Sequence, residues 1–362
     1  MKKVLVILLF LPMIGSTQGP EITSWILNIN GQTHPTYTSY LTNVQDVCYT
    51  STDVYISCTC IPGYDIGPWS GNPNTPANQN FVFKISLNPQ ENTGSKTKAP
   101  MGHIGVWSNG VSVFNAEDGM SYQNQGVWNR NALYFEGPSF DDCLGHPAPN
   151  GEYHHHVNPT CLYDDSDNQN HSPIIGYAFD NFPIYGAYGY TNTNGTGSIK
   201  RMGSSYQERN IISRTNGPSL SQYPLGAYIE DHEYVNGSGD LDEYNGRYCI
   251  TPEYPNGIYA YFVTIDANLE PVYPYTPGPY YYGVAQGSGN LGPQSGHNTV
   301  PSNCTPYTGS TTSVIQIDES IKGEAIKIVD FLGREVKNNH NSISPLLYIY
   351  ENGTVEKRII IK

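Results

Sequence analysis

Glycine and proline interrupt this 362-residue chain too often for long helices to form. The sequence contains 37 glycines and 27 prolines. Glycine weakens a helix interior, and proline removes a backbone donor and clashes with the preceding turn. The chain also has 30 tyrosines, and aromatic residues suit pleated sheets, whereas glycine and proline suit turns. We therefore expect a mainly β protein whose strands are joined by long, ordered loops.

The N-terminus has the pattern of a secretory signal peptide. Met1–Lys3 is basic, Val4–Ile14 is an apolar run, and Gly15–Thr17 supplies small residues before a cleavage site. The apolar run is too short to cross the roughly 30 Å hydrocarbon core of a membrane. We expect residues 1–18 to be removed and the mature protein to be secreted or attached to the outer cell surface. No later stretch reaches the ~18 apolar residues of a membrane span.

Acidic side chains dominate the chain outside its two ends. Residues 4–311 carry 9 Lys or Arg side chains against 25 Asp or Glu side chains. Such a surface repels the phosphates of nucleic acids and the headgroups of anionic lipids. We therefore expect no nucleic-acid partner, and the same surface would attract cations.

Composition divides the mature chain into three parts. Residues 19–283 are β-rich and short enough for one all-β domain. Residues 284–311 are rich in Gly, Ser, Thr and Asn without hydrophobic periodicity, which predicts a linker. Residues 312–362 contain three β-rich runs, the last two joined through an Asn-Gly step, which indicates a small β-sandwich ending in a hairpin.

Seven cysteines in an exported chain can form at most three internal disulfides. We predict one between Cys143 and Cys161, because these two residues flank a group of histidines. Closing a loop of that length stabilises a fold by roughly 3 kcal/mol in the chain-entropy account. The pairing of the other five cysteines stays open.

Histidines gather in one short segment, and half of the ten lie between His146 and His171. If residues 153–157 form a strand, His154 and His156 share one face and His155 points to the other. Two imidazoles at that spacing can reach one metal ion.

Two further histidines complete the predicted site. His146 and His171 lie on flanking segments that the predicted disulfide would draw toward the strand, so we predict His146, His154, His156 and His171 as metal ligands. Neutral imidazole suits transition metals, and zinc or copper is expected here. Acidic residues that could orient the imidazoles lie nearby in sequence, at Asp142, Glu152, Asp164 and Asp165.

Three functions fit this pattern at the level of sequence. The domain could hold a transition metal, or use the metal as an extracellular hydrolase with Glu243 or Glu253 as the base. Alternatively, the tyrosines could form a glycan-binding or adhesive surface while the histidines make buried hydrogen bonds.

Residues 95–283 resemble the YHYH domain family, named for a run that aligns with Tyr153–His156. In this chain His155 stands where the family has its second tyrosine. The resemblance implies no activity, because the family itself supplies none to carry over. Its further motifs are Cys143–His146, Pro159–Leu162, His171–Ser172, Ile175–Gly186, Leu241–Arg247 and Thr251–Pro255.

The C-terminal part resembles a type A sorting domain of type IX secretion cargo. The resemblance rests on Ile328–Val336, on Leu347–Tyr348 and on the basic, isoleucine-rich end Lys357–Lys362. It implies that the type IX secretion machinery is a partner of the chain and that cell-surface attachment follows export.

Overall fold

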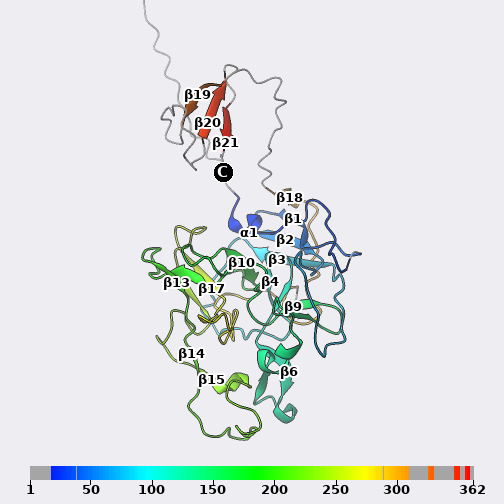
Figure 1. Ribbon diagram of the computed structural model, residues 1–362, viewed down its shortest axis with the longest axis vertical. Coiled ribbons are helices and arrows are strands. Elements are labelled where there is room, and N and C mark those ends of the chain that lie inside the picture. The colour runs from blue at the N-terminus through cyan, green and yellow to red at the C-terminus, as the bar shows by residue number, and fades with distance from the viewer. Residues whose placement is uncertain are drawn as a thin grey trace, which may run out of the picture. The chain divides into compact units, whose positions relative to one another are not determined.

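The computed structural model describes residues 18–37, 39–287 and 289–309, and three strands nearer the C-terminus (Figure 1). The chain forms two compact units, one ending at Gly309 and the other beginning at Ser310. The predicted signal peptide falls almost wholly outside the described residues. In the part of the chain that the structure describes, no helix is long and apolar enough to cross a membrane.

The larger unit is built from short strands, as its glycines, prolines and tyrosines predict. The strands are β1 (Val44–Tyr49), β2 (Asp53–Cys58), β3 (Phe81–Ser86), β4 (His103–Trp107), β5 (Ser112–Phe114), β6 (Glu117–Ser121), β7 (Asn129–Asn131), β8 (Gly145–Pro147), β9 (Tyr153–His155), β10 (Ile174–Ala178), β11 (Pro183–Tyr185), β12 (Tyr188–Tyr190), β13 (Ile199–Arg201), β14 (Tyr206–Glu208), β15 (His232–Tyr234), β16 (Gly246–Cys249), β17 (Ile258–Phe262) and β18 (Thr305–Tyr307). The helical pieces are α1 (Pro20–Thr23), α2 (Ala132–Phe135), η1 (Tyr122–Asn124), η2 (Gly137–Ser139) and η3 (Ile229–Asp231). The mainly β prediction is confirmed.

Two sheets dominate this unit. One has eight strands in the order β16-β17-β11-β10-β4-β5-β9-β8, and the other has four in the order β18-β1-β2-β3. The eight-stranded sheet is mixed, because β11 with β17 and β5 with β9 pair in parallel while its other neighbours are antiparallel. Pairs β6-β7, β12-β13 and β14-β15 form smaller two-stranded sheets.

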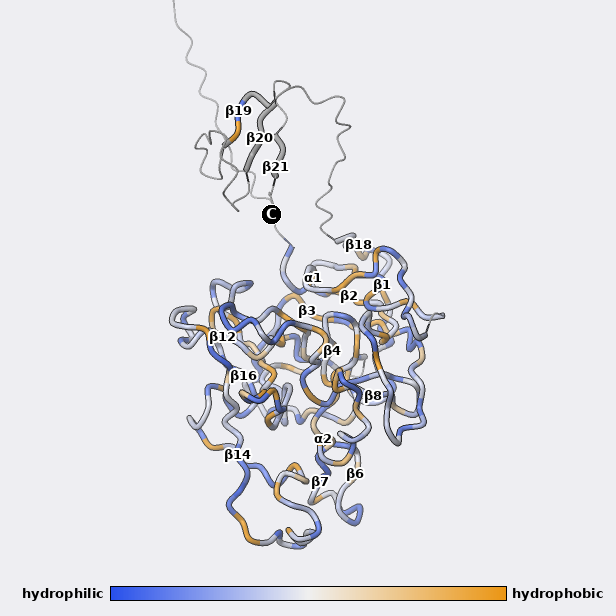
Figure 2. Tube along the Cα trace, viewed as in Figure 1, coloured by the Kyte–Doolittle hydropathy of each residue, from blue (hydrophilic) through white to orange (hydrophobic). Residues whose placement is uncertain are grey.

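The eight-stranded sheet is covered on both faces. Along β10, Tyr177 belongs to one core with residues of the four-stranded sheet such as Ile56 and Phe83, whereas the next residue, Ala178, belongs to a second core, as alternation along a strand predicts. Every residue of β10 is buried, which is the pattern of a strand with apolar neighbours on both sides. Figure 2 shows this as hydrophobic stretches along the central strands and hydrophilic stretches along the outer loops.

Composition predicts a linker over residues 284–311, but this segment belongs to the larger unit as far as Gly309. Strand β18 pairs with β1, and Cys304 forms a disulfide with Cys48. The backbone of the segment packs closely at Gly296, where φ is +86°. A side chain would not fit at this position, because a Cβ would lie 2.7 Å from the Phe83 ring. Lack of hydrophobic periodicity here reflects close backbone packing and not a free connection.

The second unit contains three described strands, β19 (Ala325–Val329), β20 (Leu346–Tyr350) and β21 (Val355–Arg358). They form an antiparallel sheet in the order β19-β20-β21. These are the three runs that the sequence predicts as strands, and the turn predicted around the Asn-Gly step lies outside the described residues.

Two of the possible disulfides are present. The predicted Cys143–Cys161 bond is confirmed, and the Cys48–Cys304 bond joins residues 256 positions apart. The remaining cysteines, Cys58, Cys60 and Cys249, are free and buried.

Candidate metal centre

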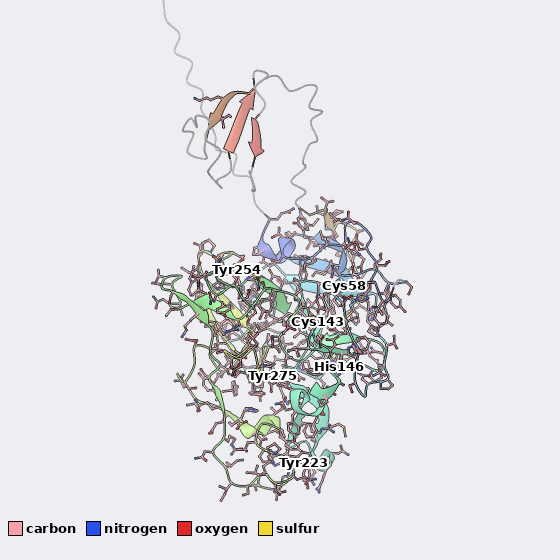
Figure 3. The ribbon with its side chains drawn as sticks, in the orientation of Figure 1. Cys58, Cys143, His146, Tyr223, Tyr254 and Tyr275 are labelled. Atoms are coloured by element: carbon pink, nitrogen blue, oxygen red, sulfur yellow. A yellow bond between two sulfur atoms is a disulfide. The ribbon has the colours of Figure 1, made fainter. Side chains whose placement is uncertain are left out.

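Strand pairing brings two of the predicted ligands opposite each other. Strand β9 pairs antiparallel with β8, with His146 in register with His154, and parallel with β5 on its other side. His146 therefore lies on a strand, and not on a flanking loop as the sequence suggests. The ring of Phe114, from β5, stacks on His154 with centroids 3.9 Å apart. Figure 3 shows His146 at the edge of the sheet that faces the short helix α2.

Three imidazoles converge at this edge. The Nε2 atom of His154 lies 3.1 Å from Nε2 of His146 and 3.1 Å from Nε2 of His156. All three side chains are buried, and their ligand atoms lie within 4.8 Å of one another. Within the described parts of the chain this is the group of histidine, cysteine and acidic residues whose geometry suits a metal ion.

His155 points the other way, as strand alternation predicts. Its ring meets Trp107 and Tyr153 edge-on in the core, and its Nε2 atom lies 3.5 Å from the Tyr64 hydroxyl. It is completely buried. His155 therefore contributes to packing on the face opposite the cluster.

The outer nitrogen of each clustered ring has an acceptor. Nδ1 of His154 bonds the main-chain oxygen of Glu152 at 3.1 Å, and Nδ1 of His156 bonds that of Asn115 at 2.6 Å. Nδ1 of His146 meets the Ser139 hydroxyl at 2.9 Å. That hydroxyl donates its own proton to the main-chain oxygen of Glu136, so it accepts from the ring. All three rings thus carry the proton on Nδ1.

This tautomer leaves a lone pair on each Nε2, and the three lone pairs point at one another. Such an arrangement is repulsive and is relieved only by an extra proton on one ring or by a cation between the rings. Outer acceptors that fix a ring in this way are typical of histidines that ligate metals.

One turn of the chain covers the cluster. It follows α2, and three of its residues contact the histidines. The Oε2 atom of Glu136 lies 3.1 Å from Nε2 of His156 and 3.6 Å from Nε2 of His146. Ser139 holds His146 as described, and the ring of Phe140 meets His146 edge-on and lies parallel to His156.

A cavity of about 540 Å³ reaches the cluster from outside. The three histidines and Glu136 all line it, and the Glu136 side chain is 30% exposed, compared with 8% for His146 and 3% for His156. Two further acidic residues on its wall are paired with cations, Glu117 with Lys98 and Asp118 with Arg130. The cluster is therefore accessible to a small molecule from the side on which Glu136 lies.

Burial changes the acid–base behaviour of the histidines. Removal from water disfavours the charged imidazolium and lowers the pKa of His146 to about 4 and that of His155 to about 3. The same cause, with the neighbouring histidines, lowers the pKa of His154 well below its usual value. Burial acts to raise the pKa of Glu136, but when His156 carries an extra proton its hydrogen bond to this carboxylate, together with nearby positive charge, outweighs burial, so this pKa is lowered.

The fourth predicted ligand, His171, does not join the cluster. Its ring packs against Tyr185, Tyr190 and Phe262, and its Nδ1 atom bonds the main-chain oxygen of Ser172. The disulfide closes only the segment between Cys143 and Cys161, and His171 lies beyond it, where the chain enters β10. Proximity in sequence did not bring this histidine to the site.

The acidic residues predicted to assist the site lie elsewhere or act differently. The Glu253 carboxylate accepts a hydrogen bond from the Tyr185 hydroxyl, and the main-chain oxygen of Glu243 accepts one from Tyr206. Asp165 pairs with Arg201. Glu152 does contact His154, but through its main-chain oxygen and not through its carboxylate.

The Glu152 side chain forms a buried network behind the cluster. Its Oε1 atom lies 2.5 Å from Nε2 of His103, and Nδ1 of His103 lies 2.9 Å from the Ser295 hydroxyl. Ser295 in turn donates to main-chain oxygens of Asn290 or Gly292. The segment around Ser295 thus fixes the residue whose carbonyl orients His154.

Sequence reasoning missed Glu136, Ser139 and Asn115. They reach the cluster from two separate parts of the chain, and no local spacing relates them to the histidines. Asn115 follows β5, which pairs with β9, whereas Glu136 and Ser139 belong to the turn after α2.

The fold and the site define a β-rich protein with a buried three-histidine cluster at the edge of a mixed sheet, open to a cavity beside a carboxylate. The family described as YHYH protein matches residues 82–273, more than half of the chain, and the chain belongs to this family. Comparison with curated proteins and with solved structures gave no match.

Proposed function

We propose that this chain is an exported protein that binds one transition-metal ion through His146, His154 and His156. Zinc and copper are the expected metals, because neutral imidazole nitrogens suit both. His171, which the sequence includes among the ligands, is not part of this proposal.

The observation that carries the proposal is the convergence of three Nε2 lone pairs. Two nitrogens that bind one tetrahedral ion at about 2.0–2.1 Å lie roughly 3.3 Å apart. The observed separations of 3.1 Å from His154 to each of the other two rings are close to that value. A purely structural histidine cluster would instead place a donor opposite each acceptor.

Export and surface attachment form the second part of the proposal. The N-terminal sequence supports secretion, and two disulfides are compatible with an oxidising compartment. The C-terminal unit, with its three antiparallel strands, supports a sorting role in which the type IX secretion machinery recognises it. The acidic composition disfavours a nucleic-acid partner, because it repels phosphates.

A metal-dependent hydrolase is the second candidate function, and one observation favours it. The three histidines line a cavity, so a metal held by them could also bind water or a substrate group. The carboxylate at hand is Glu136, and neither Glu243 nor Glu253 lies at the cluster. The glycan-binding alternative requires structural histidines, which the converging lone pairs disfavour.

Elemental analysis of the purified mature protein tests the proposal. Protein produced with zinc, copper, iron and nickel supplied should contain close to one transition-metal ion per chain. A protein that stays metal-free under all four conditions, and does not take up any of them after purification, would remove the metal-binding function and leave the cluster with a shared proton.

A further inference from the structure

We propose that the carboxylate of Glu136 is the fourth metal ligand, and that it occupies the coordination position facing the cavity. The inference rests on the proposed metal centre. It goes further, because it assigns a ligand from the turn after α2 and predicts how small molecules reach the metal.

The distances place the Glu136 carboxylate among the donor atoms. Its Oε2 atom lies 3.1 Å from Nε2 of His156 and 3.6 Å from Nε2 of His146. Oxygen and nitrogen ligands of one zinc ion, each at about 2.0–2.2 Å, are separated by roughly 3.3–3.5 Å in a tetrahedral site. The contacts of Glu136 with two histidines thus have the length expected between ligands of one ion.

The ion pairs around the cavity also support Glu136 as a metal ligand. Glu117 and Asp118, two other carboxylates that line the cavity, pair with Lys98 and Arg130 at 2.7 and 2.8 Å. Glu136 instead faces histidines whose Nδ1 protons are already donated elsewhere. A carboxylate opposite nitrogen lone pairs is stabilised by a cation placed between them.

The backbone holds this carboxylate in place. The amide of Glu136 bonds the main-chain oxygen of Ala132, and its own main-chain oxygen accepts from both the amide and the hydroxyl of Ser139. The same hydroxyl accepts from His146. One serine therefore fixes the turn that carries Glu136 relative to a proposed histidine ligand.

Glu136 also lies between the histidines and the solvent. Its side chain is the more exposed member of the set, and it lines the cavity of about 540 Å³. A small anion or neutral donor that enters the cavity must therefore bind beside this carboxylate or displace it. The carboxylate would therefore be a metal ligand that an incoming small molecule can displace.

The test uses the mature full-length chain loaded with cobalt(II) or copper(II), and two variants, Glu136→Gln and Glu136→Ala. Glu117→Gln is the matched control, because Glu117 is another carboxylate on the wall of the same cavity. Three quantities are measured: metal affinity by competition with a chelator, the visible spectrum of the cobalt form, and azide binding to the copper form.

We expect both Glu136 variants to bind metal at least about tenfold more weakly, since even groups outside the ligand set change metal affinity roughly 10–100-fold. Their cobalt spectra should change in intensity and position, and they should bind azide more tightly than the wild type. Glu117→Gln should match the wild type in all three measurements.

The two proposals fail in different ways. A wild type that binds cobalt or copper tightly, with Glu136 variants that keep its spectrum, metal affinity and azide affinity, would overturn the role of Glu136 and leave the three-histidine centre intact. A wild type that binds none of the metals would overturn the centre itself. Circular dichroism of each variant establishes that it is folded.

Discussion

The Nε2 atoms of His154 and His156 lie 3.1 Å apart, while His155 between them points into the opposite core. Side chains alternate between the two faces of a sheet, and His156, which follows the last residue of β9, continues the alternation of Tyr153–His155. The alternation gives three consecutive histidines two different roles.

Replacement of these residues by alanine should therefore have unequal effects on metal content. His154→Ala and His156→Ala should each lose most of the bound metal, because each removes one of a few ligands. His155→Ala should keep close to one ion per chain, although it should lower stability because the residue is completely buried. Elemental analysis of the folded variants decides this, and equal metal loss in all three would contradict the assignment of faces.

His146 and His171 form a second matched pair, since the sequence predicts both as ligands and the structure separates them. His146→Ala should lose metal as His154→Ala does. His171→Ala should retain it, because that ring packs among Tyr185, Tyr190 and Phe262. Isothermal titration of each metal-free variant with zinc measures the difference. A His171 variant that no longer binds zinc, while still folded, would restore this residue to the site.

The buried pair of His103 and Glu152 should matter for stability. Both side chains are almost fully excluded from solvent, at 0% and 4% exposure. Glu152→Ala should lower the free energy of unfolding by about 3–5 kcal/mol, because it leaves a buried partner uncompensated. Glu117→Gln breaks a more exposed pair with Lys98 and should cost about 1 kcal/mol or less. Urea unfolding with a chelator present measures both, and similar small losses would refute the importance of the buried network.

The metal-free protein should lose stability in acid because of its buried histidines. Their lowered pKa values mean that the unfolded chain binds protons more readily than the folded chain. Stability is therefore fully present above about pH 6.5 and falls as the pH drops toward about 4 for His146 and about 3 for His155. Each such group contributes up to about 1.4 kcal/mol per pH unit within its window.

His155→Phe tests this pH dependence without removing a proposed ligand. The variant cannot take up a proton at this position, so its unfolding free energy should fall less steeply between pH 6.5 and 4 than that of the wild type. Urea unfolding at several pH values in the presence of a chelator gives the two slopes. Identical slopes would show that protonation of His155 does not drive the loss.

The C-terminal unit should be separable from the metal-binding unit. A chain ending at Gly309 retains both large sheets, both disulfides and the histidine cluster. We expect it to unfold at the same urea concentration as the mature protein and to bind the same amount of metal. In a host with type IX secretion it should accumulate in the periplasm. Normal surface display of the shortened chain would refute the sorting role.

The sequence by itself determined features that depend on neighbours along the chain. Glycine, proline and tyrosine content predicted the β class, period-two alternation predicted the faces of His154 and His156, and the position of two cysteines on either side of the histidines predicted the Cys143–Cys161 bond. Each follows from local backbone geometry or from a loop of fewer than about 20 residues, for which sequence separation limits spatial separation.

Only the tertiary structure decided which groups from separate elements meet. It placed Glu136, Ser139 and Asn115 at the cluster, kept His171 away from it, and packed residues 284–309 into the larger unit. Cross-strand pairing and backbone packing set these contacts, and neither leaves a periodic signal in the sequence. A segment rich in glycine and serine can be either a free linker or a tightly packed backbone. Which of the two it forms depends on the surface it meets, and here that surface includes the Phe83 ring of β3.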